Sequence, residues 1–408
     1  QPYMTLKDEY IEAAWWTIKR AHEKGLLTKN LRVVTWCPRC ETALAEAEIE
    51  YKDRADPSIY VKFPVEGKED EYILIWTTTP WTLIGNLAVM MHPDYEYVRA
   101  KTEEGVLILA KELAPILKDN LGLDYEVIET LVGADLEGMR YSNPLSDKIL
   151  LKPKSEAYKA IFADFVSLKE GTGCVHSAPG HGPEDFEACA EYGIEPLCPV
   201  DERGNFTADA GKYANMRVKK DDGVIIKDLG DALLHSEEIT HRYGHCWRCK
   251  TPIIYRATEQ WFISIAPIKE KMLQEIEHVD WVPEWAGSSR FKDWVTNAKD
   301  WTISRQRYWG IPLPIWVCEK CGELGVIGSR EELRGLGFEV KELHKPYVDE
   351  VELKCSCGGI KKRVPDVLDV WFDSGVAAWA SLGYPSSKAE LQEWYPADFI
   401  TEGHDQTR

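Results

Sequence analysis

Eight of the eleven cysteines occur in four close pairs, a spacing that suits metal binding. Two thiols separated by one or two residues can reach one ion from a single tight turn, and four thiolates satisfy the tetrahedral preference of zinc. Close pairs in a chain of this length favour metal sites in a reducing compartment over a disulfide scaffold. The eight predicted ligands are Cys37, Cys40, Cys246, Cys249, Cys318, Cys321, Cys355 and Cys357.

The four pairs can combine into two sites in three ways. We assign the third pair to the fourth, because only 33 residues separate Cys321 from Cys355. The first pair then shares an ion with the second, so that residues 41–245 become an insertion whose two ends return to one metal. Both sites are expected to be structural, since four thiolates leave no ligand position open for water.

Composition limits the class of protein. With 408 residues, 44% of them hydrophobic, the chain can form two or three domains with buried cores. A net charge of −19 argues against a surface generally coated by nucleic acid but allows a local basic groove. Neither a membrane-length apolar run nor a signal-peptide pattern occurs, which predicts a cytoplasmic protein. Because the sequence begins at Gln1 without Met, we expect an internal piece of a longer protein.

Hydrophobic periodicity predicts the elements that position these residues. Apolar residues at helical spacing over 5–25 predict an amphipathic helix, with Thr5 and Asp8 as a capping-box-like start. From about residue 50 the pattern changes to short strands, and Tyr72–Trp76, apolar on both faces, is expected at the centre of a sheet. Other expected strands are 31–36, 58–63, 95–101, 106–110, 126–131, 149–152, 253–257 and 260–264, and other expected helices are 111–121, 185–192 and 266–278.

A threonine-rich loop follows the apolar strand and brings hydroxyls and turn amides to the strand end. Thr77, Thr78, Thr79 and Thr82 could there bind a ribose and a phosphate and orient a water molecule. The structural alternative is a turn whose threonines satisfy their own backbone. His176 lies in a stretch rich in Gly and Pro, where the backbone can approach a ligand closely, although a lone histidine is often a purely structural residue.

Several stretches, in one order along the whole chain, resemble class I aminoacyl-tRNA synthetases of the branched-aliphatic group, most closely the isoleucyl members of archaeal or eukaryotic type. Valyl members resemble Thr-Thr-Arg-Pro-Glu-Thr in the threonine loop, whereas this chain has Trp81 in place of the Glu. Ile84 departs from the usual Pro, which we expect to change loop rigidity. The stretches are Trp76-Thr-Thr-Thr-Pro-Trp-Thr82, Gly171-Thr-Gly-Cys-Val-His-Ser-Ala-Pro-Gly-His-Gly182 with Glu184-Asp185, His245-Cys-Trp-Arg-Cys249, Trp301-Thr-Ile-Ser-Arg-Gln-Arg-Tyr-Trp-Gly310, Asp366-Val-Leu-Asp-Val-Trp-Phe-Asp-Ser-Gly375 and Glu402-Gly-His-Asp-Gln-Thr-Arg408.

The resemblance implies an α/β multidomain chain. A partial Rossmann-type catalytic domain would be interrupted by a β-rich editing insertion and accompanied by two four-cysteine zinc knuckles. The expected divisions are a stem with half of the first knuckle (1–49), the editing domain (50–235), a return stem with the other half (236–300), a connection with the second knuckle (301–363) and a second-half piece of the catalytic domain (364–408).

The resemblance also implies a function. The complete enzyme would join isoleucine to tRNAIle with ATP and Mg²⁺, and we expect it to be a monomer without membrane contact. Valine is one methylene smaller, and a pocket rejects such a substrate by a factor of only about 10–200, for which isoleucine against valine is the standard illustration. The insertion would hydrolyse valine from mischarged tRNAIle. The His-Ile-Gly-His and Lys-Met-Ser-Lys-Ser signatures are absent, so this chain alone is not expected to make an aminoacyl adenylate.

By this resemblance the threonine loop binds the terminal nucleotide and positions water, and His176 is the steric wall that excludes isoleucine. Asp185 would receive the substrate ammonium, although a first-turn helix acid is an equally simple interpretation. No nucleophile with an adjacent base is evident, so we expect direct water attack assisted by the substrate's own ribose hydroxyl. The residues expected to form the aminoacyl-adenylate pocket of the complete enzyme are Trp371, Glu402, Gly403, Asp405 and Gln406.

Two alternatives remain open from the residues alone. One is a segment of a valyl-tRNA synthetase, and the other is a non-enzymatic zinc-ribbon module that binds RNA. Residues 281–316 favour the second alternative, because their six tryptophans interleaved with arginines are typical of surfaces that stack on bases and contact phosphates. A pure binding module would need neither the threonine loop nor the 171–182 stretch.

Overall fold

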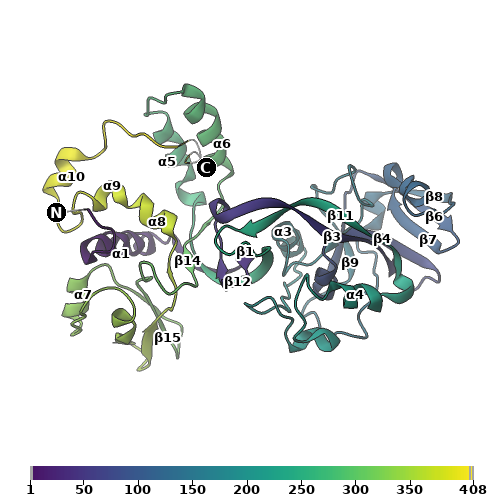
Figure 1. The fold of residues 1–408 in the computed structure, drawn as a ribbon, viewed down its shortest axis with the longest axis horizontal. Helices are drawn as coiled ribbons and strands as arrows, with labels where there is room; N and C mark the ends of the chain where they lie inside the picture. The colour runs from purple at the N-terminus through teal and green to yellow at the C-terminus, as the bar shows by residue number, and fades with distance from the viewer. Residues whose placement is uncertain (1–2, 404–405, 407–408) are drawn as a thin grey trace. The chain divides into compact units, whose positions relative to one another are not determined.

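The computed structural model describes residues 3–403 and 406, and the chain divides into two compact units (Figure 1). One unit is Leu31–Thr258, and the other combines Gln1–Asn30 with Glu259–Arg408. Strands β1 (Leu27–Cys37) and β12 (Ile254–Ile263) contain the two points at which the chain passes between the units. The first unit is therefore an insertion into the second along the sequence.

The insertion unit is built on a six-stranded mixed sheet in the order β11-β3-β4-β7-β6-β8. Strand β4 lies inside this sheet, antiparallel to β3 and parallel to β7. Ile73 and Ile75 of β4 enter one hydrophobic cluster and Leu74 enters another, which confirms a central strand apolar on both faces. The strands are β2 (Thr42–Ala43), β3 (Ile49–Pro64), β4 (Glu71–Thr77), β5 (Ala88–Met91), β6 (Glu96–Thr102), β7 (Gly105–Ala110), β8 (Glu126–Val132), β9 (Lys159–Phe162), β10 (Val175–Ser177) and β11 (Leu233–Cys246).

A second sheet of three strands, in the order β10-β5-β9, packs in layers with the first. Val89 and Met91 of β5 join the cluster shared with the six-stranded sheet, whereas Ala88 and Met90 join the cluster that contains α3. The alternation of a strand's side chains thus places the small sheet between the large sheet and α3. The helices of this unit are α2 (Ile116–Asp119), α3 (Pro183–Glu191) and α4 (Asp222–Asp228).

Strands β3 and β11 form a long antiparallel ribbon that leads into the large sheet (Figure 1). Their register runs from the pair Cys246 and Ile49 at one end to Leu233 and Val61 at the other. The cysteine at the end of β11 thereby begins the ribbon. A rigid two-stranded stem thus joins the first cysteine cluster to the sheet that carries the threonine loop.

The other unit combines α1 with a four-stranded antiparallel sheet in the order β16-β15-β18-β17. Trp15 of α1 is buried, and its Nε1 donates a hydrogen bond of 2.8 Å to the Pro312 carbonyl. The elements are α1 (Asp8–Glu23), α5 (Ala266–Ile276), α6 (Lys292–Asn297), α7 (Arg330–Gly335), α8 (Val370–Gly375), α9 (Ala377–Ala380), α10 (Ala389–Trp394), β13 (Trp301–Thr302), β14 (Ser304–Arg305), β15 (Ile315–Cys318), β16 (Leu324–Val326), β17 (Glu352–Lys354), β18 (Ile360–Arg363) and β19 (Val367–Leu368).

Four local predictions were wrong. Lys7, not Thr5, is the N-cap residue of α1, and the Asp8 carboxylate instead accepts the N–H of Leu343 and pairs with Arg330. The predicted strand 149–152 is irregular, because the N–H of Leu150 bonds outside any ladder to the Asp209 carbonyl. The predicted helix 111–121 and the predicted strand pair also differ from the structure in their bounds.

The helix over 111–121 is divided into a 3-10 turn, Lys111–Leu113, and the short helix α2. Pro115 stands between them as the N-cap residue of α2, where its missing N–H stops the first turn from continuing. The two strands expected at 253–257 and 260–264 are the single strand β12. In the part of the chain that the structure describes, no helix is both long and apolar enough to cross a membrane.

Candidate hydrolytic site and metal centres

The threonine loop connects the end of β4 to a 3-10 helix, η2 (Pro80–Gly85). Thr77, the last residue of β4, lies with its Oγ1 3.2 Å from Oγ1 of Thr79, which is 3.3 Å from Oγ1 of Thr82. Thr78 lies between the first two and is partly exposed. The loop satisfies part of its own backbone, because Thr82 Oγ1 donates to the Thr79 carbonyl and Thr77 Oγ1 accepts the Thr79 N–H. Three of the four predicted hydroxyls therefore form a chain of close contacts.

His176 joins this chain of hydroxyls. It lies on β10, opposite Val89 of β5, and its Nε2 is 2.8 Å from Oγ1 of Thr82. The other ring nitrogen, Nδ1, is 3.1 Å from Nδ2 of Asn86, the residue that follows η2. The sequence-predicted threonines and His176, which are about a hundred residues apart, thus meet at one place.

Asn86 determines where the ring proton of His176 lies. Its side-chain amide donates to the carbonyls of Ala88 (2.9 Å) and Ser177 (3.3 Å), while its Oδ1 accepts the hydroxyl of Tyr141 at 2.8 Å. These partners orient the amide with its nitrogen toward His176. An amide nitrogen can only donate, so Nδ1 accepts and the proton is on Nε2, where it is donated to Thr82.

The environment keeps the His176 ring neutral. Burial lowers the pKa of His176 to about 3, with a smaller contribution to this shift from the nearby His181. With one nitrogen accepting and the other donating, the ring has no free site for a proton from a reacting water. A fixed, uncharged ring is suited to act as a wall and unsuited to act as a general base.

Asn86 and Tyr141 are site residues that the sequence analysis missed. Both are buried, and neither belongs to a motif with a recognisable spacing. One signal was present: Asn86 directly follows the threonine loop, and an asparagine among apolar residues must find hydrogen-bond partners when it is buried. The identity of those partners depends on a fold that brings β10 beside η2.

Asp185 lies in the first turn of α3, close to the end of β10. Its Oδ2 accepts the backbone N–H of Ala178, at 2.7 Å, two residues after His176. Burial raises the pKa of Asp185 to about 6, although the Ala178 hydrogen bond opposes this shift. Gly182 is required beside it, because a Cβ there would lie 2.5 Å from Cγ of Asp185. The carboxylate is thus held in place, and a cationic partner would stabilise its ionised form.

Two further aromatic residues pack next to the threonine loop. The indole of Trp81 makes an edge contact with the ring of His181, with 4.8 Å between centroids. His181 Nδ1 is 3.0 Å from the Tyr255 carbonyl and donates to it, since a carbonyl oxygen only accepts. Burial lowers the pKa of His181 to about 4. Trp81 therefore packs against a second histidine, His181, next to the threonine loop.

The residues predicted for the adenylate pocket are in the other unit. Trp371 is in α8, and its N–H donates to Oδ1 of Asp369 at 3.2 Å. Glu402 and Gly403 are exposed, and the Gln406 N–H donates to the Gly403 carbonyl at 2.9 Å. Asp405 is outside the described residues. The role of these five residues stays a prediction.

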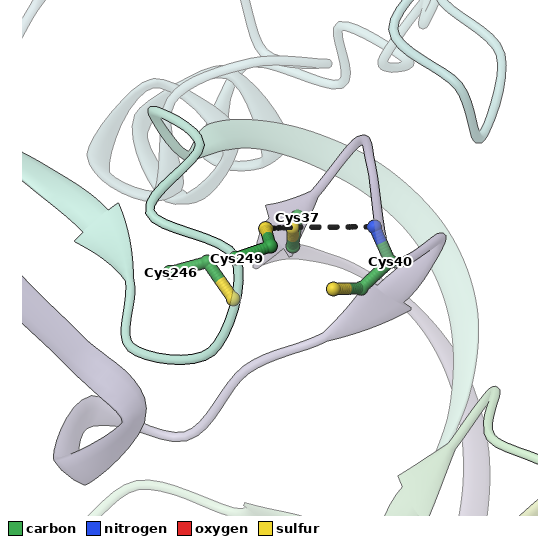
Figure 2. A group of neighbouring side chains, drawn as sticks. All are labelled: Cys37, Cys40, Cys246 and Cys249. Carbon is green, nitrogen blue, oxygen red and sulfur yellow. Dashed lines mark hydrogen bonds between the residues drawn. The ribbon is translucent and has the colours of Figure 1, made fainter.

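The first four-cysteine cluster joins the two ends of the insertion unit (Figure 2). The sulfurs of Cys37, Cys40, Cys246 and Cys249 all lie within 4.8 Å of one another and converge on one point. Sγ of Cys37 and Sγ of Cys249 are 3.4 Å apart. Zn–S bonds of about 2.3 Å separate tetrahedral sulfurs by about 3.8 Å, whereas disulfide sulfurs are about 2.05 Å apart. The spacing fits a four-thiolate metal site.

The second cluster has the same form and confirms the predicted pairing. Cys318, Cys321, Cys355 and Cys357 lie within 4.8 Å, with distances of 3.6 Å between two pairs of sulfurs. Each of the three Cys-x-x-Cys turns is closed by a residue of positive φ whose N–H bonds the first cysteine's carbonyl. These residues are Glu41 (φ 52°, 2.8 Å), Lys250 (φ 60°, 2.8 Å) and Gly322 (φ 74°, 2.9 Å).

Comparison with known proteins identifies the family. A family model described as tRNA synthetases class I (I, L, M and V) matches residues 1–408, so the chain belongs to this family. Its relatives include the isoleucine–tRNA ligases of Archaeoglobus fulgidus, 59% identical over 414 residues, and of Methanothermobacter thermautotrophicus, 58% identical over 414 residues. These alignments cover all of this chain but 40% and 39% of the two relatives.

The resemblance inferred from the motifs is thereby confirmed for the family, and both relatives are isoleucine enzymes, as the threonine loop predicts. Membership also argues against the non-enzymatic zinc-ribbon module. A solved structure titled GlLeuRS-CP1 covers 44% of this chain at 16% identity with a TM-score of 0.35, a similarity too low to establish a shared fold by itself.

Proposed function

We propose that this chain is the central part of an isoleucine–tRNA ligase and that its insertion unit hydrolyses valine from mischarged tRNAIle. The complete enzyme would join isoleucine to tRNAIle with ATP and Mg²⁺ in the cytoplasm, and its Rossmann-type catalytic domain would include residues of the second unit. The proposal is supported by the identity to isoleucine–tRNA ligases and by the arrangement of the threonine loop, His176 and Asp185.

The observation that carries the hydrolytic role is the immobile His176 ring. A site that accepts valine and rejects isoleucine needs a wall that the extra methylene of isoleucine cannot push aside. A binding pocket alone discriminates a substrate that lacks one methylene by a factor of only about 10–200. The ring is hydrogen-bonded at both nitrogens, to Thr82 and to Asn86, and Asn86 is itself bound to Tyr141. Such a wall repels a larger side chain because it cannot rotate away without losing buried hydrogen bonds.

The proposed reaction is the hydrolysis of an ester. A water oxygen attacks the ester carbonyl, and the bond from that carbonyl to the ribose oxygen breaks. The ribose oxygen takes up a proton that the attacking water gives up and leaves as a hydroxyl, and valine is released as its carboxylic acid. The hydroxyls of Thr77 and Thr79, which lie 3.2 Å apart, would orient the water and the ribose. Asp185 would hold the valine ammonium, and His176 takes no proton, since its Nδ1 already accepts the Asn86 amide.

Zinc would be held by the two four-cysteine clusters, which supply four thiolates each. A bound zinc ion would contribute folding energy without reaction chemistry, because no ligand position is left for water. The first cluster would then hold the two ends of the insertion together, next to the start of the β3–β11 ribbon.

The test compares two substrates on the 408-residue chain. tRNAIle charged with valine and the same tRNA charged with isoleucine are incubated with the protein, and the loss of each amino acid is followed. Rapid loss of valine with isoleucine retained supports the proposal. Loss of neither from a folded, zinc-loaded chain contradicts hydrolysis by this insertion, and equal loss of both contradicts the steric wall.

A further inference from the structure

A basic cavity of about 320 Å³ lies in the insertion unit beside the first cysteine cluster. It is lined on one side by Pro38 and Thr251, which belong to the two cysteine turns. The residues described as lining it include no Asp or Glu. Its charged lining residues, from β3 and from the loop before α4, are Arg54, Arg217, Lys219 and Lys220. Four cations at one place are unusual in a chain with a net charge of −19.

The less exposed cations of this group, Arg54 and Lys219, lie near two buried carboxylates, Asp56 and Asp222. Asp56 contacts both of these cations, with Oδ1 2.8 Å from Nε of Arg54 and Oδ2 3.8 Å from Nζ of Lys219. The same Oδ2 lies 3.1 Å from Nε2 of His241. Asp56 thus faces two cationic side chains and a histidine, and Asp222 adds a second negative charge near Lys219. This leaves Arg217 and Lys220 as the cations at the exposed rim. Lys219 also lies over the ring of Tyr243, 3.8 Å from its centroid, a contact that tolerates a cation without neutralising it.

The loop is built to direct cationic side chains into the cavity. Lys219 has φ 64°, a left-handed conformation that is rare for a lysine and that the surrounding contacts must maintain. Asp222 Oδ1 accepts the Lys219 N–H at 3.0 Å, and Asp221 Oδ2 accepts the Arg217 N–H at 2.7 Å. The two nearby acids therefore hold the backbone of the loop.

Lys219 is buried in an environment that disfavours its charge. Its side chain is 7% exposed, and burial, together with the nearby Arg54, lowers its pKa to about 8 against the opposing effects of Asp56 and Asp222. An anion in the cavity would offset this loss of hydration. Arg217 and Lys220 are exposed, so that the cavity is cationic from its floor to its rim.

We propose that this cavity binds phosphates of the RNA backbone and forms a second contact for the tRNA whose aminoacyl end enters the hydrolytic site. The inference rests on the proposed function, because it assigns another part of the same substrate. Lysine and arginine on phosphate position an RNA without reading its sequence. The cations come from two segments and extend from buried to exposed, which suits a chain of successive phosphates better than one small anion.

The adjoining cysteine cluster gives the site its rigidity. Pro38 follows Cys37, and Thr251 follows Cys249 by two residues, so that the turns that hold the metal also form the cavity wall. Gly204, opposite, approaches Pro38 so closely that a Cβ would lie 2.9 Å from the proline Cβ. This wall is therefore already ordered before RNA binds.

The test measures the dependence of tRNA binding on salt with the 408-residue chain and uncharged tRNAIle. Affinity falls as salt rises, so the slope of log affinity against log salt is negative. In Arg217→Gln/Lys220→Gln the magnitude of this slope should decrease by about 1.5–2, and the affinity at 0.1 M salt should decrease by about tenfold. Glutamine keeps a long polar side chain, and both residues are exposed, so folding is expected to be retained. The matched control, Lys68→Gln/Lys101→Gln, removes two exposed charges of the same unit and should keep the wild-type slope.

The outcomes separate this inference from the proposed function. A double variant with the wild-type slope, or a wild type that does not bind tRNA, overturns the backbone contact. Inorganic phosphate bound by the wild type and not by such a variant would then assign the cavity to a free anion. If the wild type binds tRNA and the double variant has a shallower salt dependence, but the wild type does not hydrolyse the valine ester, the proposed function is contradicted and the backbone contact is supported.

Discussion

Asn86 donates a hydrogen bond to Nδ1 of His176 across 3.1 Å and thereby leaves the ring proton on Nε2. The proton is then directed at Thr82, which is 2.8 Å away. The asparagine amide is oriented by two carbonyls and by the hydroxyl of Tyr141. A residue outside every recognisable motif therefore decides the tautomer and the orientation of the ring that we assign to the steric wall.

Removal of the His176 ring should relax selectivity. In His176→Ala the hydrolysis of isoleucine-charged tRNAIle should rise at least tenfold, because the space left by the ring admits one more methylene. Hydrolysis of the valine ester should change less. The rates of both reactions are measured side by side, and unchanged selectivity would refute the steric role.

Asn86→Ala should affect stability and selectivity together. The change leaves the Tyr141 hydroxyl and Nδ1 of His176 without their partner in a buried site, and the free energy of unfolding should fall by about 1–3 kcal/mol. The freed ring should also tolerate isoleucine better. Denaturant unfolding gives the first quantity and deacylation the second. Tyr141→Phe is the comparison: it removes one outer hydrogen bond and should lose stability while it keeps most of the selectivity.

The hydrolytic rate should depend on the ionisation of Asp185. Its pKa is raised to about 6, so the carboxylate is mostly protonated at pH 5 and mostly ionised at pH 7. Because the ammonium partner requires the ionised form of Asp185, kcat/KM for the valine ester should rise with pH through about 6, until the substrate ammonium itself begins to lose its proton at about pH 7.7–8.0. His176 and His181, with pKa values of about 3 and 4, do not titrate in this window.

Asp185→Asn provides the control for this pH profile. The variant should have a lower kcat/KM and should lack the rise near pH 6, once uncatalysed deacylation has been subtracted at each pH. Persistence of the rise in the variant would assign the titration to another group.

Each cysteine cluster should bind one zinc ion independently. The purified chain should contain about two zinc ions, and Cys249→Ser and Cys321→Ser should each reduce this number to about one. Loss of the first site should weaken tRNA binding, since its turns form the wall of the basic cavity. Loss of the second should leave tRNA binding by the insertion unchanged. Elemental analysis and tRNA titration test both statements, and loss of both ions from either variant would contradict independent sites.

Local sequence patterns predicted those features that depend on neighbouring residues. Cys-x-x-Cys turns position two thiols through their own backbone, so the ligands and their pairing could be recognised. Likewise, the unbroken apolar run of β4 required burial on both faces. The prediction of a strand at 149–152 was wrong because short apolar stretches lack a distinctive period, and its backbone bonds to the distant Asp209. Asp8 does not take its predicted capping role, because its carboxylate binds two distant partners, the Arg330 side chain and the Leu343 N–H.

The sequence by itself determined the family, the membership of the two four-cysteine clusters, the row of hydroxyls in the threonine loop and the interior position of the strand that precedes it. Only the tertiary structure decided that His176 meets Thr82 and Asn86, that its ring is neutral, and that cations from two segments share one cavity. The physical reason is the range of the interactions. Turn geometry and hydrophobic periodicity act within a few residues, whereas tautomers, burial and shared cavities depend on groups that only packing brings together.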